Sequence, residues 1–396
     1  MSWRLVKLEE IANVGAGNSA PQEEHLFQNG IHNFYRTSDV GRIRNGVISD
    51  SVDKLNSEGI RGLKLHSKGT ILFPKSGAST FLNHRVMLAE EGYVSSHLAT
   101  IKAKPEEADD KFLFYFLSTI DAKNLVQDSN YPSLKTSVIE KINLSIPSIA
   151  IQKKIVAKLD ATFDAVGKTT AATEANAKNV EALFQSYLTQ VFERGGKGWI
   201  STVLDKVCKV DRGSSPRPIK EYFTEADDGV NWIKIGDTEE GGKYIFSTNQ
   251  KITKAGAEKS RYVEIGDFIL TNSMSYGRPY IMRINGYIHD GWFVLRLNKD
   301  IDSEYFYYLL TSPYVQNQFQ SLAAGAVVKN ISGDLVKKTV LPIPSLSEQK
   351  KLAELFSEKQ TVLKRLSEVY YEKANALRLL KQSILKQAFS GELVKE

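Results

Sequence analysis

The sequence contains very little cysteine. Cys208 is the single cysteine among 396 residues, which excludes both an internal disulfide and a zinc site built from several cysteines. A small core residue is the simplest interpretation of this thiol. Long hydrophobic runs are missing too, because no apolar stretch reaches membrane-spanning length and the N-terminus MSWRLVKLEEIA lacks the apolar core of a signal peptide. We therefore expect a cytoplasmic protein.

Recognisable catalytic motifs are also absent. No Gly-x-Gly-x-x-Gly opens a helix, and EGGKY at 240–244 lacks the first glycine and the final Ser or Thr of a phosphate-binding loop. No NPPY or DPPY run is present to hold a flipped adenine. No Pro-Asp precedes a Glu-x-Lys as in many nucleases, and the histidines show no His-x-x-x-His spacing. Together these absences favour a binding protein over an enzyme.

The net charge is positive but is not concentrated in one segment. The formal charge of +6 is spread as 0 over residues 1–148, +1 over 149–196, +2 over 197–342 and +3 over 343–396. None of these blocks is a basic tail. A DNA-binding surface would therefore require that folding sorts basic side chains onto one face, or that a partner supplies charge.

What the sequence does contain is one unit written twice. IPSIAIQKKI begins at Ile146 and IPSLSEQKKL at Ile343, 197 positions later. At the same offset, GTILFPKS aligns with GDFILTNS and LFQSYLTQVF with LKQSILKQAF. So long a period indicates a duplicated domain rather than a solenoid. We interpret IPS…QKK as a scaffold feature with its lysines in a solvated first turn; partner or phosphate contacts by these lysines are the alternative.

A long helix is predicted after each IPS run, because seam residues recur there with a seven-residue period. Such a pattern, held over this length, predicts a coiled coil. The middle of the first helix is small and polar, which favours either close approach of two helices or a weak, bent stretch. The predicted seam consists of Leu159, Phe163, Val166, Thr170, Thr173, Ala177, Val180, Phe184, Tyr187 and Val191 in the first helix, and Phe356, Leu363, Leu366, Tyr370, Leu377, Leu380 and Ile384 in the second.

Outside these helices, each half alternates short β-rich runs with Gly, Asn, Asp and Pro turn signals. One aromatic helix recurs, as DKFLFYFLST near 110 and SEYFYYLLTS near 303, and we expect its aromatic side chains in the core. The second long helix can return antiparallel to the first. The sequence therefore predicts an α+β fold: two similar mixed α/β domains separated by a long antiparallel two-helix coiled-coil spacer, with an internal pseudo-two-fold repeat.

Each half resembles the DNA-specificity subunit of type I restriction–modification systems. The resemblance lies in the order of motifs: a starting Trp and Leu, then FYRTSDV or WIKIGDT, then GTILFPKSG or GDFILTNSM, then IPS…QKK and a long helix. It covers the whole chain and is most specific in GSSPRPIKEYF at 213–223 and LPIPSLSEQKKL at 341–352. The first half departs from the pattern at GNSAPQEEHLF, which lacks the Ser-Pro-Arg-Pro run.

The resemblance implies two target-recognition domains, at 1–147 and 196–344, and two spacer helices, at 148–195 and 345–396. Each domain would read one half of a bipartite site in double-stranded DNA. Two modification subunits would dock on this scaffold and methylate adenine with S-adenosylmethionine, and restriction subunits would cleave. The chain itself is expected to be non-catalytic, to bind no cofactor or metal and to have no membrane partner.

Candidate DNA contacts follow from the chemistry of base recognition. Base edges are read from loops and helix starts by Arg, Lys, Asn, Gln, Ser and Thr, whereas many other contacts hold only phosphate. Such residues cluster in RGSSPRP, NSMSYGRP and AVVKNISG and in the matching stretches of the first half; a turn or surface role is the alternative for each. The candidates are Asn18, Arg36, Lys75, Ser76, Ser79, Tyr131, Lys135, Arg212, Ser214, Arg217, Asn272, Ser273, Tyr276, Arg278, Lys329 and Asn330.

Two other classes of function compete with this interpretation. A stand-alone tandem DNA-binding regulator would need no enzymatic partner, although nothing in the chain resembles a helix-turn-helix. A structural coiled-coil adaptor would have no need for polar, Gly-containing loops at equivalent places in both halves. Co-purification separates the three, because only a specificity subunit requires a methyltransferase partner.

Overall fold

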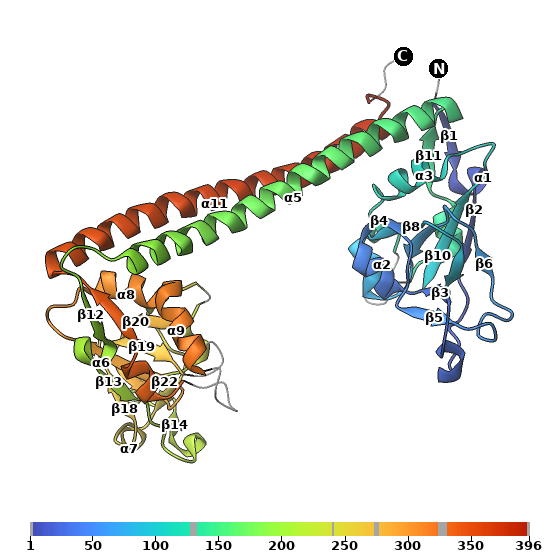
Figure 1. Cartoon of the computed structure of the whole chain (residues 1–396). Helices are drawn as coiled ribbons and strands as arrows, with labels where there is room; N and C mark the ends of the chain where they lie inside the picture. The colour runs from blue at the N-terminus through green and yellow to red at the C-terminus, as the bar shows by residue number, and fades with distance from the viewer. Residues whose placement is uncertain (1–2, 127–132, 240, 273–276, 324–330, 394–396) are drawn as a thin grey trace. The chain divides into compact units, whose positions relative to one another are not determined.

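The chain divides into two compact units that share two long helices. Unit 1 comprises Met1–Thr173 and Glu372–Glu396, and unit 2 comprises Glu174–Tyr371. Helices α5 (Ile149–Arg194) and α11 (Leu346–Phe389) each contribute one part to each unit (Figure 1). Among the described helices, none combines the length and apolar character needed to cross a bilayer. This computed structural model describes residues 3–126, 133–239, 241–272, 277–323 and 331–393.

Unit 1 is built on a five-stranded sheet with the order β2-β10-β7-β8-β4. The pairs are antiparallel except that β4 runs parallel to β8. A second sheet has the order β5-β3-β9-β6, and β1 pairs with β11. The strands are β1 (Arg4–Lys7), β2 (Ala12–Ala16), β3 (His32–Tyr35), β4 (Asn45–Ile48), β5 (Asp53–Leu55), β6 (Leu65–His66), β7 (Ile71–Pro74), β8 (Arg85–Leu88), β9 (Gly92–Val94), β10 (Leu98–Ala103) and β11 (Asn143–Ile146).

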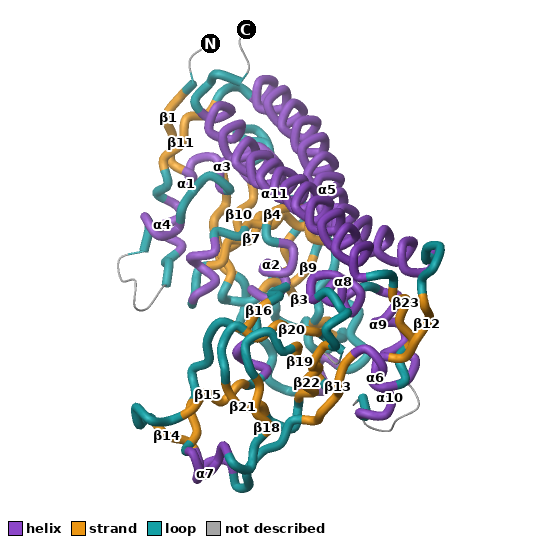
Figure 2. The backbone as a smooth tube through the Cα atoms, turned by 90° about the vertical axis from the view of Figure 1, so that its left-hand side faces the viewer, coloured by secondary structure: helices purple, strands orange, loops and turns teal. Residues whose placement is uncertain are grey.

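Unit 2 repeats this topology with one additional strand. Its main sheet has the order β13-β22-β19-β20-β16, again with a parallel edge pair, β16 with β20. The second sheet, β14-β17-β15-β21-β18, gains one edge strand, β14 (Figure 2). The duplication predicted from the sequence is thus confirmed. The strands are β12 (Ile200–Val203), β13 (Cys208–Arg212), β14 (Phe223–Thr224), β15 (Val230–Ile233), β16 (Tyr244–Ile245), β17 (Lys251–Ile252), β18 (Arg261–Val263), β19 (Phe268–Thr271), β20 (Pro279–Met282), β21 (Gly286–Ile288), β22 (Trp292–Leu297) and β23 (Val340–Ile343).

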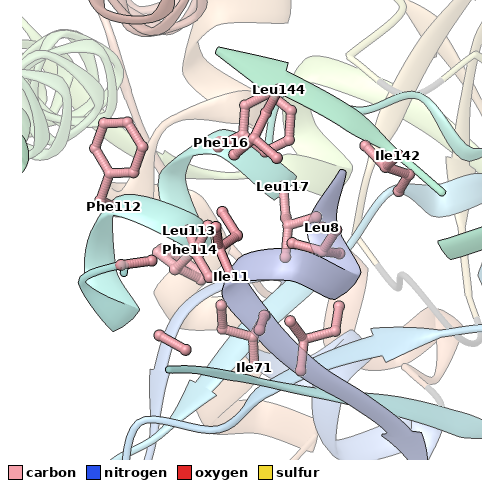
Figure 3. Close-up of a cluster of buried hydrophobic side chains, with 14 of the residues drawn as sticks. Leu8, Ile11, Ile71, Phe112, Leu113, Phe114, Phe116, Leu117, Ile142 and Leu144 are labelled. Carbon is pink, nitrogen blue, oxygen red and sulfur yellow. The ribbon is translucent and has the colours of Figure 1, made fainter. Parts of the chain in front are cut away.

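Short helices complete each unit, and the recurring aromatic helix lies in the core as expected. Phe112 of α3 and Phe306 of α8 are fully buried, and Figure 3 shows the α3 side chains packed among Leu8, Ile71 and Leu144. The short helices are α1 (Leu8–Ile11), α2 (Thr37–Ile43), α3 (Asp110–Leu117), α4 (Thr136–Glu140), α6 (Leu204–Val207), α7 (Lys254–Ala257), α8 (Ser303–Thr311), α9 (Pro313–Ala323) and α10 (Gly333–Lys337), with 3₁₀ turns η1 (Glu24–Phe27), η2 (Ala78–Leu82), η3 (Ala122–Asn124), η4 (Ile219–Tyr222) and η5 (Ile235–Asp237).

The two long helices pack side by side within each unit, with their chain directions opposed. In unit 1 the Lys381 ammonium lies 4.8 Å from the Phe163 ring centroid. In unit 2 the Tyr187 and Phe356 ring centroids are 6.1 Å apart. Along α5 the predicted seam residues are buried or half-buried, and the small residue Ala177 is fully buried, but Leu188 and Phe192, which the prediction did not include, are buried as well. The small middle of this helix is not a break, since α5 is continuous.

One part of the predicted seam was wrong. Leu366 and Leu380 of α11 are 40% and 46% exposed, whereas Ser367, Ala374 and Ala388 are buried. The buried residues of the second seam column of α11 therefore lie four residues after the first column, as in α5, and these buried residues are small. The prediction placed Leu366 and Leu380 in the seam because they are hydrophobic. A close contact between two helices, however, favours small side chains.

The repeated glutamine of IPS…QKK anchors each long helix to its domain. Gln152 is fully buried; its Oε1 accepts the Asp109 N–H at 2.9 Å, and its Nε2 donates to the carbonyls of Pro147 and Glu107 at 2.9 and 3.2 Å. The adjacent Lys153 and Lys154 are exposed. Gln349 does the same in unit 2, with Asp302, Pro344 and Asp300 as partners. The repeat is therefore a structural feature, because its glutamine satisfies buried backbone groups.

Candidate nucleic-acid interface

Three loops of unit 2 meet at the ends of the adjacent strands β13, β22 and β19. The Gly213 N–H donates to the Trp292 carbonyl at 2.8 Å, and the Asn272 N–H donates to the Gly291 carbonyl at 3.0 Å. The Ile331 N–H donates to the Asn272 carbonyl at 3.1 Å, which brings a fourth segment to the same place. Backbone hydrogen bonds thus hold the loops after β13, after β19 and before β22 side by side.

Asp290 is the hub of this cluster. Its carboxylate accepts hydrogen bonds from the Ser215 hydroxyl at 2.9 Å and the Arg217 guanidinium at 3.1 Å. Its carbonyl accepts from the Asn272 side-chain amide at 2.6 Å and from Arg212 Nε at 3.4 Å. One residue between β21 and β22 therefore organises polar side chains from both neighbouring loops.

The Asp290 carboxylate remains charged at neutral pH. Partial burial raises the pKa of Asp290. Hydrogen bonds from Ser215 and from its own amide, together with the charges of His289 and Arg217, lower the pKa by more than burial raises it, so the net pKa lies below its ordinary value. The Arg217 side chain is 81% exposed. An ion pair so exposed contributes little to stability.

Unit 1 contains the same loop arrangement. The Gly17 N–H donates to the Leu98 carbonyl at 3.2 Å, and the Lys75 N–H donates to the His97 carbonyl at 3.0 Å. The Leu134 N–H donates to the Lys75 carbonyl at 2.8 Å. These bonds match those of unit 2 one for one, so Lys75 takes the place of Asn272. The Lys75 side chain is half-buried.

In each unit a glycine is required where the loop after the first strand of the main sheet passes close to the backbone of a neighbouring segment. A Cβ at Gly17 would lie 2.0 Å from the Val94 carbonyl oxygen, and a Cβ at Gly213 would lie 1.9 Å from the His289 carbonyl oxygen. Both distances are far inside van der Waals contact with backbone that cannot rotate away. Gly17 in GAGNS and Gly213 in RGSSP are therefore explained by this close approach of two backbone segments.

The structure places the other described candidates of unit 1 on these loops. Asn18 follows the crossing glycine, and its Oδ1 accepts the Lys64 N–H at 2.9 Å. The Ser79 hydroxyl donates to the Ser76 carbonyl at 3.0 Å within the loop after β7. Lys135 is exposed at the start of α4. Backbone hydrogen bonds bring the segments that carry these residues together although they are far apart in the sequence.

In unit 2 the described candidates lie on the matching loops. Arg212 is exposed at the end of β13, and the half-buried Ser214 donates its N–H to the Ile288 carbonyl at 3.3 Å. Arg278 precedes β20, and its guanidinium carbon lies 5.4 Å from the Tyr280 ring centroid. Arg212 and Arg217 both contact Asp290, whereas Arg278 lies on the loop before β20.

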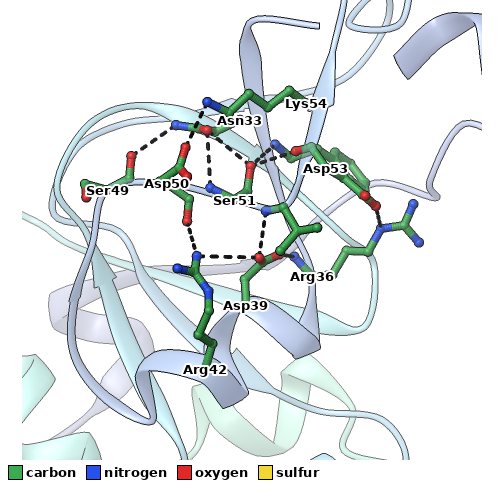
Figure 4. Close-up of polar contacts among 11 residues, drawn as sticks. Asn33, Arg36, Asp39, Arg42, Ser49, Asp50, Ser51, Asp53 and Lys54 are labelled. Atoms are coloured by element: carbon green, nitrogen blue, oxygen red, sulfur yellow. Dashed lines mark hydrogen bonds and ion pairs between the residues drawn. The ribbon is translucent and has the colours of Figure 1, made fainter. Parts of the chain in front are cut away.

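Arg36 has partners within its own unit. Its N–H donates to Asp39 Oδ2 at 2.8 Å, and its guanidinium pairs with Asp53 (Figure 4). Lys234 N–H and Asp237 form the same backbone-to-carboxylate bond in unit 2, also at 2.8 Å. The aspartate shared by FYRTSDV and WIKIGDT therefore caps the turn that follows each strand.

Asn272 is only 4% exposed. Its amide is engaged by the Asp290 carbonyl, so in this structure it holds the loop in place. Several candidates cannot be placed in this arrangement. Those that lie outside the described residues are Tyr131, Ser273, Tyr276, Lys329 and Asn330.

Sequence reasoning missed the residues between β21 and β22 and their counterparts. Asp290 and Ser215 were not candidates, and neither was Ser96, which occupies the Asp290 position in unit 1 by strand register. A usable signal was the Asp-Gly of IHDGW, a turn dipeptide between two β-rich runs. The two turns align only with a three-residue change of offset, which hid their equivalence.

Two further observations bear on chemistry. Cys208 is buried in the unit 2 core, and burial raises the pKa of its thiol to about 12. Within the part of the chain that the structure describes, no group of three His, Cys, Asp or Glu side chains is placed to hold a metal ion.

The sequence is similar to those of type I restriction enzyme specificity subunits. Curated relatives include the type I restriction enzyme MjaVIII specificity subunit of Methanocaldococcus jannaschii, 23% identical over 382 residues (89% of this chain, 84% of the relative). The type I restriction enzyme EcoBI specificity subunit of Escherichia coli is 20% identical over 430 residues (100% of this chain, 87% of the relative). The chain thus aligns with these relatives over most of their length.

Solved structures share the fold. A crystal structure of the HsdS subunit from Thermoanaerobacter tengcongensis matches with a TM-score of 0.61 at 20% identity, covering 99% of this chain and 97% of that chain. A structure from work on complex assembly and conformational transition of the type I R-M system matches with a TM-score of 0.76 at 19% identity (99% of this chain, 98% of that chain).

A family match covers both copies of the repeat. The family described as type I restriction modification DNA specificity domain matches residues 1–179 and again residues 196–366. These two segments include both main sheets and both sets of converging loops. With the duplicated topology and the relatives aligned over most of the chain, the protein belongs to the type I restriction modification DNA specificity domain family.

Proposed function

We propose that this chain is the sequence-specific DNA-binding subunit of a type I restriction–modification complex, and that each unit reads one half of a bipartite site. One observation carries the proposal: the same loop arrangement is built twice on equivalent strands, with different side chains. Lys75 stands where unit 2 has Asn272, and Ser96 where it has Asp290. Equivalent scaffolds with different loops are what recognition of two different half-sites requires.

The loop side chains supply both phosphate and base contacts. Exposed arginines and lysines attract phosphate without sequence preference, and those that reach a base edge add specificity. Arg36 and Asn272 support the loops from within, as their internal partners favour. The proposed DNA contacts are Asn18, Lys75, Ser76, Ser79, Tyr131 and Lys135 in the first half, and Arg212, Ser214, Arg217, Ser273, Tyr276, Arg278, Lys329 and Asn330 in the second.

The long helices serve as the spacer in this proposal. α5 contains 46 residues, which corresponds to about 69 Å at 1.5 Å per residue. Two modification subunits bind the scaffold, carry S-adenosylmethionine and methylate adenine, and restriction subunits cleave DNA. The chain itself supplies no catalytic group and no cofactor. The complex works in the cytoplasm, where its DNA target lies.

Reconstitution tests this proposal. The purified chain, a modification subunit from the same genome, and their mixture are each incubated with DNA and S-adenosylmethionine, and methyl transfer to adenine is measured. We expect a stable complex, and activity only in the mixture. Methyl transfer by the chain alone, or failure of the two proteins to form a complex, would contradict the assignment.

A stand-alone tandem DNA-binding regulator is the other candidate function. It would bind a specific site tightly without a partner, and a modification subunit would not change that affinity. Quantitative binding with and without the modification subunit separates the two candidates.

A further inference from the structure

We propose that Asp290 is a positioning residue that orients the Arg217 guanidinium to read a guanine in the half-site bound by unit 2. This inference rests on the proposed function, and it names the nucleobase that unit 2 reads and the residue that orients the reading side chain. Arginine is the side chain that pairs through two parallel hydrogen bonds with O6 and N7 of guanine in the major groove. Such pairing is planar and demands a fixed guanidinium orientation.

The geometry leaves Arg217 able to make that pairing. A guanidinium has five N–H donors, and one terminal nitrogen of Arg217 contacts Asp290 Oδ2 at 3.1 Å. Within the described chain no other hydrogen bond engages this guanidinium, and the side chain is 81% exposed. The remaining donors are therefore accessible to a base edge while one corner is held.

Hydrogen bonds other than those of the Asp290 carboxylate also hold these loops together. The backbone of this segment is fixed by other groups: its carbonyl accepts the Asn272 amide at 2.6 Å, and the Gly291 carbonyl accepts the Asn272 N–H at 3.0 Å. Apart from its own backbone N–H and the neighbouring His289 at 3.9 Å, the carboxylate contacts the side chains of Ser215 and Arg217 among described residues. The Asp290 carbonyl thus holds the loop, whereas the Asp290 carboxylate contacts the Arg217 side chain.

Fixing a long exposed side chain costs conformational entropy in the free protein but favours DNA binding. In the free protein, the conformational entropy lost by ordering an exposed arginine offsets the Coulomb energy of the ion pair, so the pair adds little net stability. On binding, however, a side chain that is already ordered loses less conformational entropy. The carboxylate also repels nearby phosphates. Retaining a negative charge at a DNA-reading surface is therefore explained by selectivity rather than by affinity.

This reasoning predicts opposite effects on selectivity and on non-specific affinity. Asp290→Asn keeps an oxygen that accepts the Ser215 hydroxyl but presents an amide group to Arg217. Guanine discrimination should fall, because Arg217 loses its fixed orientation. Non-specific binding should strengthen, because a negative charge is removed. A residue that merely stabilises the loop would weaken both.

The experiment maps methylated adenines for the chain co-expressed with its modification subunit. The variants are Asp290→Asn, Arg217→Ala and the double variant. The matched control is Asp228→Asn, because Asp228 pairs with Lys254 at 3.1 Å on the surface of the same unit, with side chains 70% and 73% exposed. Competition binding with random-sequence DNA gives the non-specific affinity.

We expect Asp290→Asn and Arg217→Ala to relax the same guanine position by roughly 5- to 150-fold, the range of one bidentate pair. The double variant should relax it no further than Arg217→Ala does, because Asp290 acts through Arg217. The other half-site and the Asp228→Asn motif should match wild type. Asp290→Asn should bind random DNA at least as tightly as wild type.

Several outcomes would overturn the inference. These are relaxation at different positions, additive losses in the double variant, a half-site without guanine, or an Asp290→Asn variant that unfolds. A wild-type complex that yields no bipartite motif would instead contradict the proposed function, so the two failures are distinguishable.

Discussion

Replacing Gln349 with methionine tests how the repeated IPS…Q motif holds each unit together. Gln349 is 1% exposed, and its amide makes three hydrogen bonds to backbone: from the Asp302 N–H at 2.8 Å, to the Pro344 carbonyl at 3.0 Å and to the Asp300 carbonyl at 3.1 Å. Methionine has nearly the same volume but cannot satisfy these groups. The change therefore removes the bonds without opening a cavity.

The expected loss of unfolding free energy follows from these contacts. Three hydrogen bonds at about 1 kcal/mol each give about 3 kcal/mol, and the unpaired buried groups add about 1 kcal/mol more. For a unit of roughly 200 residues, each kcal/mol lowers Tm by about 2–4 °C. The transition of unit 2 should therefore shift down by about 8–16 °C.

Calorimetry with hydrogen exchange measures this effect and locates it. The amides at the start of α8 (Ser303–Thr311), which follow Asp302, should lose protection first. Gln152→Met should do the same to α3 in unit 1, whereas the exposed neighbour Lys350→Met should change stability by less than about 0.5 kcal/mol. If Gln349→Met unfolds within 1 kcal/mol of the Lys350→Met control, the glutamine does not anchor the helix.

Three further predictions concern recognition. Gly213→Ala places a Cβ 1.9 Å from the His289 carbonyl oxygen, so methylation mapping should show loss of selectivity in the unit 2 half-site alone. Arg278→Ala should cost about 1–3 kcal/mol at one base, or all sequences equally if it holds phosphate; relaxation in the other half-site would refute its placement. Seven residues inserted after both Thr173 and Tyr370 keep the seam in phase and add about 10 Å, so the mapped spacer should change while both half-site sequences persist.

The sequence predicted the large features of the fold because they are set by periodic patterns. The 197-residue offset exposed the duplication, and the seven-residue pattern from Leu159 located the buried face of α5. Such patterns report how side chains distribute around an element. The error at Leu366 has the same origin, since hydrophobicity alone does not reveal where two backbones approach closely and small residues such as Ser367 are selected.

The candidate site was only partly predictable. Polar loops after strands located Lys75 and Arg217, but nothing local in the sequence links Ser215 to Asp290, 75 positions away. That contact depends on which strands become neighbours, here β13 and β22. The burial of Asn272 likewise follows from the tertiary path of the loop, so a polar residue in a Gly-containing loop turned out to hold the backbone.

The central claim is that the two units read two separate half-sites. It is tested most directly by sequencing modified bases in the DNA of cells that express this chain with its modification subunit. We predict methylated adenines within a single bipartite motif, two specified half-sites separated by unspecified bases, which vanish when this chain is deleted. Methylation at one continuous motif, or methylation that persists without this chain, would contradict the claim.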